Sequence, residues 1–266
     1  MKLKKYLSIF LLLLLFVSCK GYNKVVKSDD YQRKFELADE LYNSKQYMRS
    51  VTLYEQVYQK FPKTGEGELA YYRIGKAYYA EKDYYMAGYY LGAFSQRFPY
   101  SANAEETLFL SAMCSVSNSP EFTLDQNDTE IAINTLQQFI DKYPNSTLVD
   151  SCNHVMDRLR MKIQLKEYQG VKLYSKTENY RAAVTSAETF LADYPVSAKR
   201  EEISYLLVEN SFLLTKNSIE SKKKERIDQT IKRYRNFVNE FPESKYKRRL
   251  NTISDEMERQ KEIHKS

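Results

Sequence analysis

The chain has 266 residues and a formal net charge of +6, with 42% hydrophobic and 29% charged residues. That balance is typical of a globular protein and excludes a disordered one. The chain has only seven glycines, which disfavours a sheet with many tight turns, and it has 24 tyrosines, many of them at helical spacing.

The first eighteen residues have the pattern of an export signal. A basic start is followed by an almost continuously apolar run, Leu7 to Val17, which is shorter than the roughly 20 residues needed to span a bilayer. The run ends in Phe16-Val17-Ser18-Cys19, which resembles a bacterial lipobox. We therefore expect residues 1–18 to be a lipoprotein signal peptide, Cys19 to carry acyl chains and residues 19–29 to form a short polar tether. The alternative is a plain secretory signal that happens to end near a cysteine.

Five of the six prolines share one context: an aromatic residue, Pro, any residue, then Ser or Thr. They are Pro62, Pro99, Pro144, Pro195 and Pro242, at spacings of 37, 45, 51 and 47 residues. Proline ends a helix, and a Ser or Thr two residues later is a suitable cap for the next one. Spacings of this size indicate an array of helical repeats with insertions.

Residues 69–101 match the 34-residue tetratricopeptide repeat most closely. The repeat requires small residues at two positions, which Gly75 and Ala87 occupy here. The positions that require large side chains carry Tyr71, Ile74, Tyr78, Leu91 and Phe94. The small residues are expected where the two helices approach closely. The fold class is therefore all-α, a tetratricopeptide-repeat solenoid of about five helix pairs with a C-terminal capping helix.

The remaining repeats end in the same aromatic-proline pattern. We expect repeats one to three in residues 30–145 and repeats four, five and the capping helix in residues 146–266. In repeat three Asp128 is the expected N-cap of the second helix. Repeat four should begin with an unusually long helix, Leu148 to about Ser175, and repeat five should break at a charged loop, Lys216 to Glu225.

No motif for catalysis, cofactor binding or metal binding occurs in the sequence. The two histidines, His154 and His264, lack ligand spacing. Cys114 and Cys152 are either a disulfide pair, which an oxidising periplasm permits, or two buried thiols, which we favour. We expect no enzyme activity, no cofactor and no metal.

A solenoid of this type presents a groove lined by the first helix of each repeat. The groove positions of repeats one and two include Phe35, Tyr42, Tyr72, Lys76 and Tyr79. This aromatic and mixed polar lining suits an extended or β-hairpin peptide rich in aromatic residues. The alternative for any one ring is simple packing.

Charge is concentrated near the C-terminus, where residues 216–266 carry 15 basic and 9 acidic side chains. A basic helical end suits an acidic partner, anionic head groups or nucleic acid. The export signal argues against nucleic acid.

A lipobox at Cys19 followed by five tetratricopeptide repeats resembles the BamD family, the lipoprotein subunits of the outer-membrane β-barrel assembly machine. The acidic insertion at residues 124–129 and the Tyr143-Pro144-Asn145-Ser146 stop are similar to that family's third repeat. The resemblance covers nearly all of the mature chain.

The resemblance implies an outer-membrane protein assembly factor, anchored by lipid on the periplasmic face, with two working surfaces. The groove residues above would receive C-terminal signals of unfolded outer-membrane proteins. The basic region around Arg226, Arg233, Arg235 and Arg248 would bind a BamA-like β-barrel subunit, and Lys222 to Lys224 would alternatively meet anionic head groups. Other interpretations are a periplasmic tetratricopeptide lipoprotein that coordinates envelope division or peptidoglycan assembly, or a glycan-binding lipoprotein.

Overall fold

The computed structural model describes residues 21–263, in which every regular element is an α-helix. The signal peptide expected at residues 1–18 and the lipidation site Cys19 lie outside the described residues. No helix in the described part of the chain is both long and apolar enough to cross a bilayer. The chain divides into two compact units, Met1–Asp157 and Arg158–Ser266.

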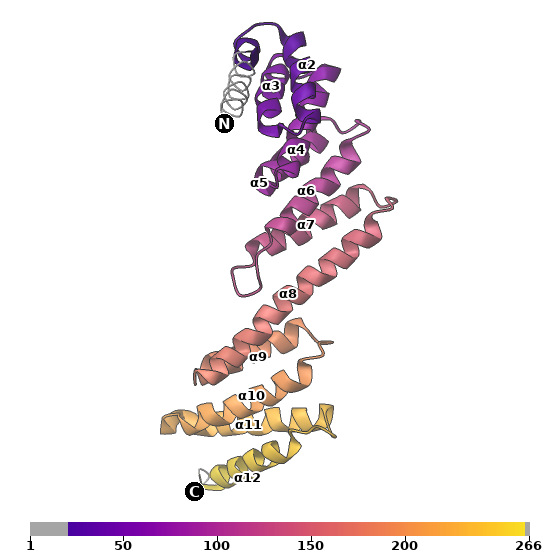
Figure 1. The fold of residues 1–266 in the computed structure, drawn as a ribbon. Helices are drawn as coiled ribbons and strands as arrows, with labels where there is room; N and C mark the ends of the chain where they lie inside the picture. Colours follow the sequence, from indigo (N-terminus) through magenta and orange to yellow (C-terminus); the bar gives the residue numbers. More distant parts are fainter. Residues whose placement is uncertain (1–20, 264–266) are drawn as a thin grey trace, which may run out of the picture. The chain divides into compact units, whose positions relative to one another are not determined.

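The described part of the first unit consists of consecutive helix hairpins (Figure 1). Each helix of repeats one to three packs on the next helix of these repeats, so the three repeats form a continuous stack. The helices are α2 (Tyr31–Asn43), α3 (Tyr47–Lys60), α4 (Gly65–Ala80), α5 (Tyr84–Arg97), α6 (Ala104–Asn118) and α7 (Asn127–Lys142), followed by the first part of α8 (Val149–Lys176). The pairs α2/α3, α4/α5 and α6/α7 are the three repeats expected in residues 30–145.

In the second unit, the later part of α8 packs on α9 (Tyr180–Asp193) through a shared apolar cluster. The chain continues as α10 (Arg200–Lys216), α11 (Glu220–Glu240) and α12 (Lys247–Ile263). The long first helix of repeat four is confirmed. The charged loop expected at residues 216–225 is wrong, because α11 already begins at Glu220. Its Lys- and Glu-rich start is made of good helix formers, and Lys223 pairs with Glu220 one turn away at 3.1 Å.

In repeats one, two and four, the two helices are joined by a break that contains a residue with left-handed backbone conformation. Lys45, Lys82 and Glu178 have φ of 61°, 62° and 59°. In each break the amide of the next residue donates back to the carbonyl of a residue five positions earlier, as Gln46 N does to Leu41 O at 2.8 Å. This geometry is a helix C-terminal motif that usually uses glycine. The same turn, built without glycine, therefore recurs in repeats one, two and four.

The aromatic-proline stops end α3, α5, α7, α9 and α11 as expected. At the first stop, Thr64 caps α4 by accepting from Gly67 N at 3.2 Å. At the other four, the serine is a turn residue and not the cap, because the following helix begins a few residues later. Ser101 shows the pattern: its amide donates to Phe98 O at 3.1 Å, and its hydroxyl accepts from Asn103 N at 3.2 Å.

The expected N-cap at Asp128 is also wrong. α7 begins one residue earlier, at Asn127, and Asp128 lies in the first turn, where its negative charge still favours the helix. The insertion before α7 is held by Gln126, a buried residue whose amide donates to Glu121 O and Leu124 O, both at 2.9 Å.

The core of the first unit confirms the steric role of the small residues. Ala38, Ala87 and Ala132 are fully buried. A Cβ added to Gly75 would lie 2.8 Å from Cδ2 of Leu91, so α4 and α5 approach too closely for a larger residue. The interhelical distance therefore depends on these positions.

The chain directly before α2 packs on the first repeat instead of extending as a polar tether. Residues 21–26 are helical, and Tyr22, Val25 and Val26 contact the core cluster of the first unit. The Tyr22 hydroxyl donates to Arg49 O at 3.0 Å, and the Arg49 guanidinium lies 4.3 Å from the Tyr22 ring centroid. The first repeat is thus extended by an additional helical turn from its N-terminal side.

Candidate functional site

The expected groove residues lie on α2 and α4, the first helices of repeats one and two. Phe35, Tyr42, Tyr72, Lys76 and Tyr79 are all partly buried, so each presents only part of its surface to solvent. The apolar residues between them on the same helices, such as Ala38 and Ile74, are fully buried. The helical period therefore places the five residues at the edge of the core, where each is partly accessible to solvent.

On the α2 side of the groove, Tyr42 is the centre of an aromatic and cationic cluster. Its ring is edge-on to Tyr47 at 5.3 Å and to Tyr54 at 6.4 Å between centroids. The guanidinium of Arg73, from α4, lies 4.5 Å from the Tyr42 ring centroid. Arg73 Nε is buried and has no hydrogen-bond partner within the described residues. Arg73 therefore places a cation against Tyr42 and has a buried donor, Nε, without an acceptor among the described residues.

A carboxylate on α2, that of Asp39, is already hydrogen-bonded to a tyrosine. Asp39, also on α2, accepts a short hydrogen bond from the Tyr54 hydroxyl. Phe35 packs edge-on against the same Tyr54 ring, at 6.1 Å between centroids. Tyr54 thus contacts both the Asp39 carboxylate and the Phe35 ring. The Arg73 guanidinium lies against the Tyr42 ring.

Between α4 and α6, two of the expected residues meet through a carboxylate that the sequence did not single out. Glu106 accepts from the Tyr72 hydroxyl at 2.8 Å and from Lys76 Nζ at 2.6 Å. Burial would raise the pKa of Glu106, but the hydrogen bonds from Lys76 and Tyr72 outweigh it and hold the pKa below its ordinary value. Repeats two and three are therefore joined across the groove floor by a charge-assisted network.

Tyr79 has a different environment from the other four residues. Its ring packs edge-on against Tyr84 of α5, at 5.8 Å between centroids, and it contacts the core cluster. Burial raises the pKa of its hydroxyl. Tyr79 is consequently a packing residue on at least one side, which is the alternative that the sequence left open for each ring.

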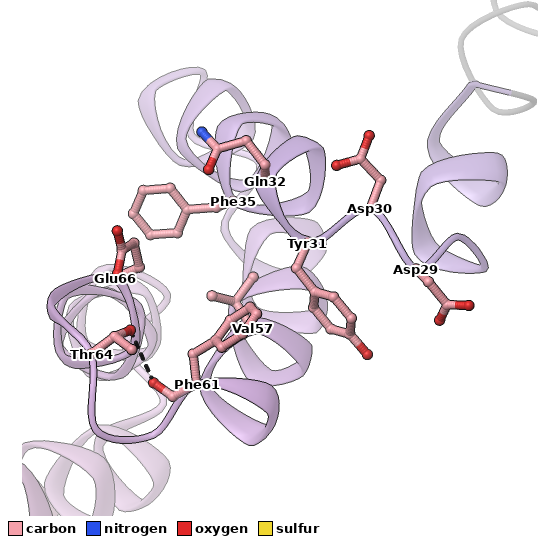
Figure 2. Close-up of a pocket in the computed structure, with 9 residues that line it drawn as sticks. All are labelled: Asp29, Asp30, Tyr31, Gln32, Phe35, Val57, Phe61, Thr64 and Glu66. Atoms are coloured by element: carbon pink, nitrogen blue, oxygen red, sulfur yellow. Dashed lines mark hydrogen bonds between the residues drawn. The ribbon is translucent and has the colours of Figure 1, made fainter.

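A pocket of about 510 Å³ lies at the end of the groove where α2 and α4 begin (Figure 2). Figure 2 shows the Phe35 ring pointing from α2 toward Glu66 at the start of α4. In the turn before α4, the Thr64 hydroxyl donates to Phe61 O at 3.2 Å. The charged lining residues are all acidic: Asp29, Asp30 and Glu66. The pocket thus combines aromatic walls with a negative rim.

The four arginines of the expected partner surface do not form one open patch. Arg233 pairs with Glu188 of α9 at 2.6 Å and donates to Ser211 of α10. Arg235, on the same helix, pairs with Glu258 of α12 at 3.2 Å. The two arginines therefore face different neighbours, because two residues of separation on a helix turns side chains apart.

The other two arginines differ in exposure. Arg226 is half-buried and hydrogen-bonded to the Ser218 hydroxyl, in the turn between α10 and α11. Arg248 is exposed and has no ion-pair partner in the described part of the chain. Arg235 is also accessible in spite of its ion pair, with 67% of its side chain exposed. Arg235 and Arg248 are consequently the members of the set that an external partner can reach.

Cys114 and Cys152 are free and buried. Burial raises the pKa of Cys114 to about 12 and also raises that of Cys152. These features agree with the interpretation of buried thiols. No group of three or more potential metal ligands occurs within the described residues.

Comparison with known proteins finds a matching family and a similar curated protein. The model of the YfiO family, described as outer membrane lipoprotein, matches residues 28–187 and 168–262. The outer membrane protein assembly factor BamD of Pasteurella multocida (strain Pm70) is 20% identical over 231 residues, which cover 83% of this chain and 88% of that protein.

Two solved structures of repeat proteins are also similar. A thermophilic tetratricopeptide-repeat protein of Thermus thermophilus has 16% identity and a TM-score of 0.32, covering 84% of this chain and 98% of its own. A putative kinesin light chain with tetratricopeptide-like repeats from Podosopora anserina has 14% identity and a TM-score of 0.32, covering 80% and 96%.

The stacked helix hairpins, the small residues at their crossings and the groove lined by first helices define a tetratricopeptide-repeat scaffold. Within that class the family match extends over most of the chain. The protein belongs to the YfiO family of outer membrane lipoproteins.

Proposed function

We propose that this protein is an outer-membrane protein assembly factor that acts by binding and not by catalysis. The groove on α2 and α4 receives the C-terminal segments of unfolded outer-membrane proteins. The second unit binds a BamA-like β-barrel subunit, and acyl chains on Cys19 hold the protein on the periplasmic face of the outer membrane. The family match and the name of the Pasteurella relative support this function.

The observation that carries the groove assignment is the environment of Arg73. Its guanidinium lies against Tyr42 and has a buried Nε without an acceptor among the described residues. A peptide with an aromatic C-terminal residue offers both a ring for the tyrosines and a carboxylate for the guanidinium. Phe35 and Tyr72 extend the aromatic wall on either side, and Lys76 adds a second cation.

The test measures binding of a fluorescent peptide that ends in an aromatic residue with a free carboxylate. Arg73→Met should weaken binding about tenfold to a hundredfold, since a hydrogen bond to a charged group contributes about 1.5–3 kcal/mol. Arg97→Met is the matched control, because Arg97 also lies against a tyrosine, Tyr71, at 5.3 Å, but on α5. Amidating the peptide should weaken wild-type binding similarly and leave the Arg73→Met variant unaffected. Equal weakening by both arginine variants would refute the role of Arg73.

A second test addresses the aromatic wall. Replacing Tyr72 and Tyr79 together by leucine should reduce crosslinking to the same peptide while the helical circular dichroism is retained. Unchanged crosslinking would mean that these rings serve packing alone.

We place the partner surface on α11 and α12, centred on Arg235 and Arg248, with Arg226 and Arg233 supporting it from inside the unit. Capture of the full chain by the periplasmic domains of a BamA-like subunit tests this directly. Charge reversal of Arg248 to Glu should reduce capture, whereas the same change at Arg181, an exposed residue on α9, should not. No capture of the wild-type chain would favour a different periplasmic role in envelope or peptidoglycan assembly.

The anchor has its own test. Cys19→Ala should move the protein from the outer-membrane fraction to the soluble periplasmic fraction, because acyl chains provide stable membrane attachment. Continued fractionation of this variant with the outer membrane would contradict the lipid anchor.

A further inference from the structure

The first repeat carries a second pocket, of about 340 Å³, next to the one in Figure 2. It shares Asp29 and Tyr31 with that pocket but is otherwise formed by the segment before α2, the first turn of α2 and the last turns of α3. Its remaining lining residues are Val26, Lys27, Ser28, Lys34, Gln56, Gln59 and Lys60.

Two ammonium groups of this pocket lie against one aromatic ring. Lys34 Nζ is 4.7 Å and Lys60 Nζ is 5.7 Å from the centroid of Tyr31. Lys34 is only 4% exposed, which is rare for a lysine without an ionic partner. Neither lysine forms an ion pair within residues 21–263. The ring attracts both cations, but it accepts no hydrogen bond of the strength that a carboxylate would accept.

The rest of the lining compensates the positive charge only in part. Lys27 adds a third ammonium group, and Asp29 is the one carboxylate among the lining residues, exposed and outside any ion pair in the described part of the chain. The side-chain oxygen of Gln56 is buried and has no donor among the described residues. The neighbouring pocket has three carboxylates and no cation in its lining. A net positive charge in the lining therefore distinguishes this pocket from its neighbour.

We propose that the lysine pocket formed by Lys27, Lys34 and Lys60 binds a phosphate group. A phosphate presents several oxygen acceptors to three ammonium groups, and lysine is a common phosphate ligand in proteins. Binding would give the buried Lys34 the anionic partner that the fold does not supply.

Position favours the head group of an anionic phospholipid as the source of the phosphate. The chain is fixed to the first repeat from residue 21 onwards, where Tyr22 bonds to Arg49. If Cys19 is acylated, as proposed above, the two residues from Cys19 to Gly21 reach at most about 7 Å. The lysine pocket would then lie within reach of the head groups. The choice of source depends on the proposed anchor, whereas the phosphate chemistry does not.

The first experiment tests the phosphate chemistry on the full chain in a neutral detergent. The acetylation rates of individual lysines are measured by mass spectrometry in inorganic phosphate and in chloride at equal ionic strength. Phosphate should slow acetylation of Lys27 and Lys60 at least threefold and leave the exposed Lys63, outside the pocket, unchanged. Equal rates in the two salts, or equal slowing of Lys63, would overturn the proposal.

Two variants separate binding from folding. Lys34→Met keeps an unbranched side chain, one atom shorter and without charge, and it should abolish the protection of Lys27 and Lys60 by phosphate while circular dichroism remains that of the wild type. Lys60→Gln, at an exposed position, should reduce the protection of Lys27, and Lys63→Gln should not. Full protection in Lys60→Gln would contradict a shared site even if Lys34→Met failed to fold.

The second experiment identifies the source of the phosphate. The full chain is placed in nanodiscs of phosphatidylcholine with or without phosphatidylglycerol, and the same lysines are compared. Protection of Lys27 and Lys60 by phosphatidylglycerol supports a lipid head group. Protection by inorganic phosphate alone would refute the lipid source and retain a soluble phosphate ligand. Loss of the anchor would affect only this second experiment, so the two proposals fail separately.

Discussion

Gly67 is the position where a single added methyl group should be most damaging. It is the third residue of α4, directly after the first aromatic-proline stop. An ideal Cβ at this position would lie 1.9 Å from the carbonyl oxygen of Phe61 and 2.9 Å from its carbonyl carbon. Both are backbone atoms, so no side chain can rotate away to make room. Gly67→Ala must therefore displace the α3–α4 turn.

The size of the effect follows from two opposing contributions. Overpacking costs about 1–3 kcal/mol, and the upper end applies here because backbone must move by about 1 Å. The better helix propensity of alanine raises the free energy of unfolding by at most about 1 kcal/mol. The net loss of unfolding free energy is about 2 kcal/mol, which lowers the melting temperature of a unit of this size by about 4–8 °C.

Gly65→Ala is the matched control. Gly65 lies on the same helix two residues earlier, and a Cβ there meets nothing within 4 Å. Thermal unfolding followed by circular dichroism at 222 nm should show Gly65→Ala at or slightly above the wild-type melting temperature and Gly67→Ala well below it. The reasoning is refuted if both variants melt within 1 °C of the wild type.

Three further predictions concern other parts of the chain. Gly170→Ala, in the last third of α8 where an added Cβ meets nothing within 4 Å, should stabilise the second unit by about 1 kcal/mol, and an unchanged or lower melting temperature would contradict this. Glu106→Gln should lower the free energy of unfolding by at most about 1 kcal/mol at pH 7, because its partners are partly screened by solvent. Since the folded-state pKa of Glu106 is depressed, its contribution is complete above the unfolded-state pKa and disappears as the pH falls through the folded-state pKa. Urea unfolding should therefore show a difference in unfolding free energy between wild type and variant at pH 7, and this difference should disappear as the pH is lowered through the folded-state pKa. Iodoacetamide should alkylate Cys114 at pH 8 about a thousandfold more slowly in the native protein than in urea, since a pKa of about 12 leaves little thiolate; rates within tenfold would be inconsistent with its burial.

The repeat architecture could be predicted from local chemistry because proline and small residues act on their immediate surroundings. Each aromatic-proline stop ended a helix where expected, and Gly75 is buried against Leu91 as the repeat pattern required. The predictions were wrong where the same residues are compatible with two local conformations. Serine after Pro99 suits a cap as well as a turn, and Glu220 to Glu225 suits a helix as well as a solvated loop.

The groove was predictable only in part. Helical spacing identified the face that carries Tyr42 and Tyr72, but Arg73 and Glu106 act across to a neighbouring repeat. Their roles depend on how consecutive repeats stack, which spacing within one helix does not determine. The count of basic residues near the C-terminus similarly did not reveal that Arg233 pairs with Glu188.

The uneven distribution of tyrosine gives the protein a natural optical probe. Of the 24 tyrosines, 17 precede residue 158, and the chain has no tryptophan. Tyrosine emission is therefore not lost by energy transfer to indole, and it comes mainly from the unit that contains the groove. A tryptophan-free peptide that displaces Tyr42 from Arg73, or Tyr72 from Glu106, should change this emission without an added label. Tyrosine emission would also report mainly on the unfolding of the first unit, whereas circular dichroism reports on the unfolding of both units.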